Sequence, residues 1–232
     1  MDLIWDGIRE AFSILGSGNR DVWEITLRSL AVSGSATAIA LVIGIATGAT
    51  LAFRRFPGRN VLVTLVNTGM GLPPVVVGLV VAILLWRSGP LGGLNLIYTP
   101  GAIVIAQVVI AAPLVTGFTV AALGAQPPQL RTQLYGLGAS RLQMLWLVLQ
   151  EARLPLLAAI MAGFGAAVSE VGASLMVGGN LAGETRVLTT AVVLEVQRGE
   201  FDAAIALSII LLVLIFLVNL VLTTVQQRER SS

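Results

Sequence analysis

One carboxylate lies deep inside an otherwise apolar stretch of this sequence. Glu170 interrupts the run from Leu154 to Val177, which is long enough to cross a hydrocarbon layer ~30 Å thick. Because an ionisable side chain is costly in hydrocarbon, such a residue is by default a candidate functional group. Chemically, this carboxylate could carry a proton, bind an arginine, pair two helices or shape a gate.

Two prolines interrupt a second apolar run, Asn60 to Trp86. Pro73 and Pro74 remove backbone hydrogen-bond donors and kink a helix, and the freed carbonyls need neighbours or water in hydrocarbon. With Gly78 one turn further on, the sequence predicts a kink that lines a pathway. A packing kink without any role in transport is the alternative.

Residues 127–153 form a polar, arginine-bearing segment between apolar runs. Two prolines open it, two glycines interrupt it, and a pair with the spacing of a capping box follows: Pro127, Pro128, Gly136, Gly138, Ser140 and Gln143. Proline suits the first turn of a helix and glycine its end, while S-x-x-Q starts a new helix. The pattern predicts a helix, a glycine bend and a second helix. Such a bend could bind a soluble partner, and a linker lying on the lipid headgroups is the alternative.

The composition excludes several classes of protein. The 232 residues are 56% hydrophobic and 11% charged, with a mean hydropathy of +0.91, which is typical of a polytopic membrane protein. All 14 basic residues are arginine, and the chain contains no Lys, His or Cys. It therefore lacks a phosphate-binding G-x-x-x-x-G-K-[ST] loop, the usual soft metal ligands and a thiol nucleophile. A formal charge of +2 is too small to favour a nucleic-acid partner.

Five apolar runs predict an all-α fold with five transmembrane helices. They span about residues 29–53, 60–86, 100–125, 154–177 and 203–225. Gly44 and Gly48 form a G-x-x-x-G on the first of them, which predicts close helix packing. The runs lie within one predicted domain, residues 24–222, followed by a tail, 223–232.

The opening stretch, residues 1–23, is acidic, and its apolar residues recur about one helical turn apart. It therefore predicts an amphipathic helix on the membrane surface rather than a cleavable signal peptide.

Arginines alternate between the predicted loops. Eight lie in the first and third segments that connect the spans and in the C-terminal tail, and six lie on the opposite side. Because basic residues favour the cytoplasmic side, we expect a protein of the cell membrane whose C-terminus is cytoplasmic and whose N-terminus is extracytoplasmic.

Three segments carry a resemblance to a known family. "GLGASRLQMLWLVLQEARLPLLAAIMAGFGAAVSEVGASLMVGGN", which begins at Gly136, resembles the signature region of permease subunits of type I ABC importers. In that family a loop of pattern E-A-A-x-x-x-G forms a coupling helix that docks into the ATPase subunit. Gly138 aligns with the family's glycine, whereas Thr132, Gln133 and Leu134 replace E-A-A. "LPPVVVG" from Leu72 and "SEVGASLMVGGN" from Ser169 resemble molybdate, tungstate and sulfate permeases, and the whole chain looks most like the tungstate type.

The resemblance implies a membrane subunit that is not itself an enzyme and holds no cofactor or metal. ATP would bind a cytoplasmic dimer of ABC ATPases, an extracytoplasmic protein would deliver the oxyanion, and this chain would form the pathway by alternating access. Since five spans do not easily enclose a path, we expect a homodimer. The implied coupling residues are Leu137, Gly138, Ala139, Ser140 and Arg141. The implied residues of the pathway or gate are Pro73, Pro74, Gly78, Glu170, Gly172 and Asn180.

An ion-coupled secondary transporter that uses Glu170 as its proton carrier is the alternative function. That class tends to show internal repeats with helices broken at matching positions, and the proline pair of the second run has no counterpart downstream. A membrane-embedded enzyme is less consistent still, because the chain lacks His, Cys, Lys and paired intramembrane carboxylates. The stretch "VLTTAVVLEV" in the outer loop would be amphipathic if helical, and could cover the exit mouth.

Overall fold

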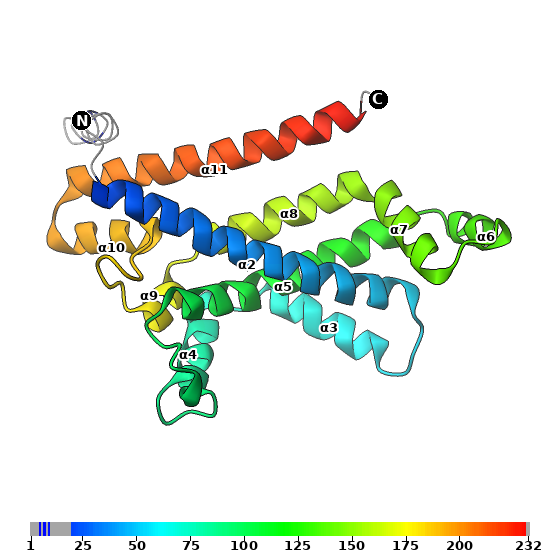
Figure 1. Ribbon diagram of the computed structural model, residues 1–232, viewed down its shortest axis with the longest axis horizontal. Coiled ribbons are helices and arrows are strands. Elements are labelled where there is room, and N and C mark those ends of the chain that lie inside the picture. The colour runs from blue at the N-terminus through cyan, green and yellow to red at the C-terminus, as the bar shows by residue number, and fades with distance from the viewer. Residues whose placement is uncertain (1–4, 6, 8, 10–19, 231–232) are drawn as a thin grey trace.

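The computed structural model describes residues 5, 7, 9 and 20–230, and within them the chain is helical and contains no strand (Figure 1). The elements are α2 (Arg20–Phe53), α3 (Arg59–Met70), α4 (Pro74–Leu85), η1 (Gly92–Leu94), α5 (Pro100–Gly124), α6 (Pro128–Gly136), α7 (Arg141–Glu151), α8 (Arg153–Val168), α9 (Gly172–Gly178), α10 (Leu188–Arg198) and α11 (Phe201–Arg230). The predicted amphipathic opening, 1–23, lies largely outside the described residues. The predicted tail, 223–232, continues α11 as far as Arg230.

Three helices of the described chain are long and apolar enough to cross a membrane unaided: α2, α5 and α11. Two further spans are formed only if a pair of bent helices is counted as one, namely α3 with α4 and α7 with α8. The predicted spans 29–53, 100–125 and 203–225 fall on α2, α5 and α11, and 60–86 falls on α3 and α4, whereas 154–177 falls on α8 and α9 rather than on the pair α7 and α8.

The central contact of the fold joins α2 to α5 through small residues. A Cβ added to Gly44 would lie 2.5 Å from Cγ1 of Val115, and one added to Gly48 would lie 2.6 Å from Cβ of Thr119. Such distances are shorter than any side chain tolerates, so the two backbones approach as closely as glycine permits. The prediction that this G-x-x-x-G serves close packing is confirmed.

The second predicted span is broken rather than kinked. α3 and α4 form an angle of 105°, and Figure 1 shows α4 pointing away from the long axis of the molecule. The backbone N–H groups of Gly71 and Leu72 turn back to Thr68 and Gly69 at 3.1 and 3.3 Å, which closes α3. Because Pro73 and Pro74 cannot donate to the preceding turn, the helix stops, and Pro74 becomes the first residue of α4.

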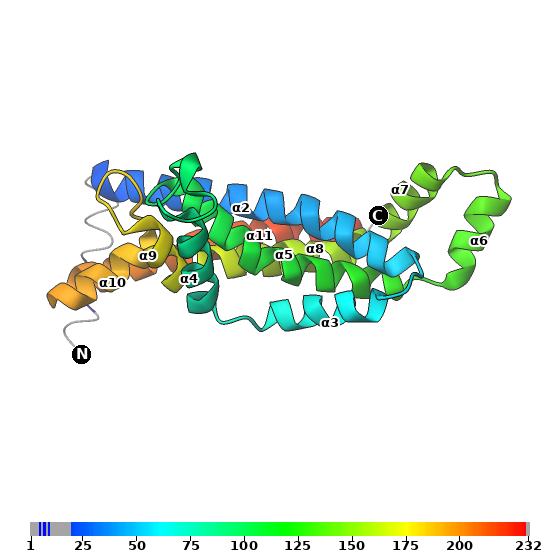
Figure 2. The same cartoon turned by 90° about the horizontal axis from the view of Figure 1, so that it is seen from below.

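The two ends of the molecule hold different parts of the chain. Figures 1 and 2 place α6, α7 and the turn between α2 and α3 toward one end, to which the C-terminal end of α11 also runs. The other end holds α9, α10 and the start of α2. The connecting segments assigned to the inner side from their arginines thus gather toward a common end.

Candidate functional site

The polar segment 127–153 folds as the predicted helix, bend and helix. Gly138 has φ +85°, a left-handed conformation that glycine adopts without strain, and the N–H of Ala139 donates to the carbonyl of Leu134 at 3.0 Å. The capping box is present. The N–H of Ser140 donates to Oε1 of Gln143 at 2.8 Å, and the N–H of Gln143 donates to Oγ of Ser140 at 3.4 Å. The bend is therefore held by its own hydrogen bonds.

The bend presents exposed apolar side chains, and the helix that follows it, α7, packs on the rest of the protein. Leu137 is 84% exposed at the turn, and Ala139 and Ser140 follow it into α7. A shallow pocket of about 510 Å³ lies against the bend, lined by Leu134, Leu137, Gly138, Ala139, Gln143, Trp146 and Leu147. On its other side α7 buries Met144 and Val148 in a cluster with the C-terminal ends of α2 and α5. A force applied to the bend would therefore reach the spans through packed side chains.

Glu170 occupies a break in the fourth predicted span. α8 ends at Val168 and α9 begins at Gly172, so the predicted continuous span 154–177 is interrupted. The Glu170 side chain is buried, and its Oε1 accepts the backbone N–H of Ala173 at 2.7 Å. The backbone carbonyl of Glu170 accepts the hydroxyl of Thr189 at 2.9 Å. Among the described residues no arginine pairs with this carboxylate; instead it caps α9.

The predicted pathway residues of the second and fourth spans lie together. A Cβ on Gly78 would lie 2.6 Å from Cα of Ala173, and one on Gly172 would lie 3.0 Å from Cγ2 of Val75. Helix α4 therefore packs directly on α9, beside the Glu170 carboxylate. Pro73 and Pro74 lie at the start of α4, as its N-cap and first residue.

Asn180 belongs to the loop that follows α9. It has φ +51°, and its Nδ2 donates to the carbonyl of Thr190 at 3.3 Å. Thr190 directly follows the Thr189 that binds the Glu170 carbonyl, so the first turn of α10 connects Glu170 with Asn180. The predicted helix in this loop is present as α10.

The same loop is fastened to α2 by residues that we did not select from the sequence. Arg28 donates to the carbonyls of Gly183 and Arg186 at 2.7 and 3.1 Å, and Oγ of Ser29 accepts the N–H of Leu188 at 2.7 Å. In the sequence, Arg28 is one of the six arginines on the side opposite the predicted cytoplasmic one. Neighbouring residues do not show whether an arginine only biases the membrane orientation or also binds carbonyls more than 150 positions away in the chain.

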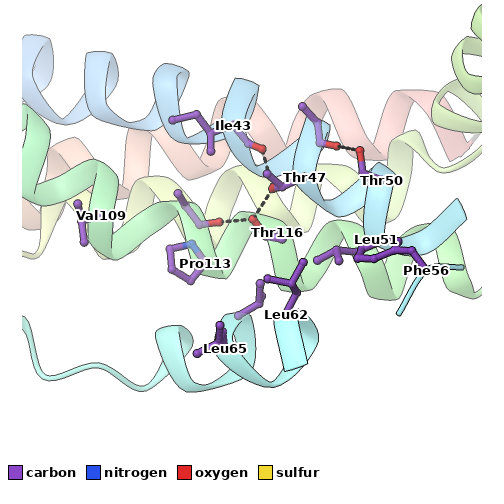
Figure 3. Close-up of a pocket in the computed structure, with 13 residues that line it drawn as sticks. Ile43, Thr47, Thr50, Leu51, Phe56, Leu62, Leu65, Val109, Pro113 and Thr116 are labelled. Carbon is purple, nitrogen blue, oxygen red and sulfur yellow. Dashed lines mark hydrogen bonds between the residues drawn. The ribbon is translucent and has the colours of Figure 1, made fainter. Parts of the chain in front are cut away.

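A cavity of about 630 Å³ lies between α2, α3 and α5, with Thr47 and Thr116 at its back wall (Figure 3). Their hydroxyl oxygens are 3.0 Å apart, and each hydroxyl is also bonded to a carbonyl of its own helix, that of Ile43 or Ala112, at 2.7 Å. Thr50 likewise donates to Ala46 at 2.8 Å. Since an oxyanion requires donors, this largely apolar cavity is a poor binding site for one.

Known proteins match almost the whole chain. Residues 40–231 match the family described as "Binding-protein-dependent transport system inner membrane component". A probable anion ABC transporter permease protein of Haloferax volcanii is 40% identical over 200 residues, covering 84% of this chain and 86% of the relative. The tungstate uptake system permease protein TupB of Peptoclostridium acidaminophilum is 37% identical over 227 residues, covering 98% of this chain and all of the relative.

A solved structure shows the same fold. The crystal structure of an amino acid ABC transporter with histidines matches with a TM-score of 0.67 at 16% identity, covering 94% of this chain and 98% of that one.

Proposed function

Because the chain belongs to the family of inner-membrane components of binding-protein-dependent transport systems, we propose that it is the permease subunit of an ATP-driven importer for an oxyanion, first of all tungstate. The observation that carries this proposal is the end-to-end similarity to a tungstate permease, 98% of this chain against the whole of the relative. The chain is a multi-pass membrane protein, and its partners are an ATPase and a binding protein.

The structure suggests how the parts divide the work. ATP binds and is hydrolysed on the partner ATPases, which dock at the bend around Leu137, Gly138, Ala139, Ser140 and Arg141. Two copies of the chain enclose the pathway along their shared axis. The α4–α9 contact, with Gly78, Glu170 and Gly172, then forms a gate that opens or closes when the ATPases move α7.

Uptake in reconstituted vesicles tests this proposal. Proteoliposomes that contain the chain with its copurifying ATPase should accumulate tungstate only when ATP is enclosed on the ATPase side and the binding protein is present outside. Internal tungsten is measured by elemental mass spectrometry, with molybdate and sulfate assayed in parallel. Uptake that requires neither ATP nor the ATPase would contradict the proposal.

Substitution of Glu170 distinguishes an ATP-driven importer from a proton-coupled carrier. Because Oε1 accepts the N–H of Ala173, Glu170→Gln keeps an acceptor at that atom. We expect its ATP-driven uptake to stay within about threefold of the unchanged protein, a difference of less than 1 kcal/mol. Glu170→Ala removes the cap and should cost about 0.5–2 kcal/mol of stability, measured as a lower Tm. Loss of uptake in Glu170→Gln, together with loss on collapse of the proton gradient, would instead identify a proton carrier.

A further inference from the structure

A second pocket, separate from the bend, lies where α2 ends. It has a volume of about 570 Å³ and is lined by Ile45, Ala46, Ala49, Thr50, Phe53, Arg54, Arg131, Tyr135, Arg141, Leu142, Met144, Leu145 and Leu149. We call it the basic pocket, because three of these residues are arginines and none is acidic. It brings the last turns of α2 together with α6 and α7.

The positive charges of the basic pocket have no carboxylate partner among the described residues. The guanidinium of Arg131 lies over the ring of Phe53, 4.6 Å from its centroid, while its Nε is buried and has no hydrogen-bond partner. A buried donor without an acceptor is destabilising. Arg54 and Arg141 also line the pocket without an ion pair within the described part of the chain. Because the Nε of Arg131 is closed to solvent, an anion in the pocket would meet the other guanidinium N–H groups of the three arginines.

The apolar part of the basic pocket favours an amphiphilic anion over a small inorganic one. Most of the other lining side chains are aliphatic, including Ile45, Leu142, Leu145 and Leu149, and Leu142 is 78% exposed. A small inorganic anion would leave this apolar surface in water. An amphiphile would cover it with a hydrocarbon chain while its headgroup meets the arginines.

The basic pocket and the apolar bend use opposite faces of α7. The pocket takes Arg141, Leu142, Leu145 and Leu149, whereas the shallow pocket at the bend takes Gln143, Trp146 and Leu147. At 100° per residue these two sets lie on different sides of the helix. Apart from Arg141, which lies at the start of α7 and belongs to both the bend and the basic pocket, an ATPase docked at the bend would contact side chains other than those of the basic pocket.

We propose that the basic pocket binds the phosphate headgroup of an anionic phospholipid from the leaflet next to α6 and α7. The arginines contact the phosphate, and one acyl chain lies along the aliphatic wall. The site depends neither on the identity of the cargo nor on the transport function, so its test can fail while transport stands, and the reverse.

Native mass spectrometry of the full chain in mild detergent tests this site with two probes, phosphatidylglycerol and phosphatidylcholine of the same acyl chains. Phosphatidylglycerol should bind at least about tenfold more tightly, because only its headgroup carries a net negative charge. Arg54→Gln and Arg131→Gln should each weaken its binding about fivefold. Arg131→Lys keeps the charge but loses the planar contact with Phe53, and should lose less than Arg131→Gln.

Arg55→Gln is the matched control. Arg55 carries the same charge as Arg54 and follows it directly in the chain, but it does not line the basic pocket. The substitution should leave binding unchanged, and equal Tm values across the variants show that all of them fold. Equal affinity for the two lipids, or equal losses in Arg54→Gln and Arg55→Gln, would overturn the proposal. Displacement of the lipid by soluble glycerol phosphate would assign the pocket to a soluble anion, and exclusion of lipid by the bound ATPase would assign it to acidic residues of that partner.

Discussion

Leu137→Asp is expected to abolish ATP-driven uptake while the chain remains in the membrane. Leu137 is 84% exposed at a bend held by its own hydrogen bonds, so the change leaves the fold intact. Burying a leucine side chain contributes about 1.5–3 kcal/mol, and burying an unpaired carboxylate instead costs several more. The affinity for the ATPase should therefore fall by more than about 100-fold. Copurification of the ATPase and tungstate uptake measure the effect.

Leu94→Asp is the matched control for that experiment. Leu94 is also exposed, but it lies in η1, which follows α4 in the chain and contacts it, and Figure 1 shows α4 far from α6 and α7. It should leave the amount of copurifying ATPase unchanged. If both variants lose the ATPase equally, the loss reflects damage to the protein in general, and the bend has no particular role in docking.

Gly44→Leu is expected to destabilise the fold more than any surface substitution. A Cβ at this position would lie 2.5 and 2.6 Å from side-chain atoms of Val115 and 3.0 Å from the backbone nitrogen of Thr116. The side chain of Val115 can rotate, but the backbone of α5 cannot move without separating the two central helices. Overpacking typically costs about 1–3 kcal/mol, and the backbone contact places this substitution near the upper end, which corresponds to a fall in Tm of roughly 6–12 °C. Thermal unfolding of the purified chain in detergent measures it.

Gly34→Leu provides the comparison on the same helix. A Cβ at Gly34 would meet nothing within 4 Å, so the variant gains helix propensity without a collision. Its Tm should equal or exceed that of the unchanged protein. A similar loss of stability in both variants would show that α2 tolerates no leucine in either position, and that the contact with α5 is not the cause.

Features encoded by neighbouring residues were predictable from the sequence. The bend around Gly138 and the Ser140–Gln143 cap follow from turn chemistry within a few positions. The long apolar runs and the G-x-x-x-G at Gly44 likewise carry their structural meaning in their own spacing. These signals were enough to identify the helical fold and the placement of the polar segment.

Features that depend on distant contacts were not predictable in the same way. Prolines indicate that a helix is disturbed, but the 105° turn between α3 and α4 is set by how α4 packs on α9 at Gly78. The carboxylate of Glu170 signals an unusual site, whereas its partner, the N–H of Ala173, exists as a free donor only because α9 begins there. Arg28 and Arg131 have partners on other helices or loops, so their roles emerge only from the folded chain.

Helix α2 is attached to other parts of the protein near both of its ends, and its length sets the distance between these attachments. At 1.5 Å per residue the 34 residues of α2 extend about 50 Å. Near its start, Arg28 and Ser29 form hydrogen bonds with the loop that follows α9. At its end, Phe53 lies under Arg131 of α6. The tight contact of Gly44 and Gly48 with α5 divides α2 into an arm of about 25 Å toward Arg28 and an arm of about 10 Å toward Phe53. If α2 tilted as a rigid rod about this contact, the loop that follows α9 would move about 2.5 times as far as the end of α2 at Phe53, and in the opposite direction.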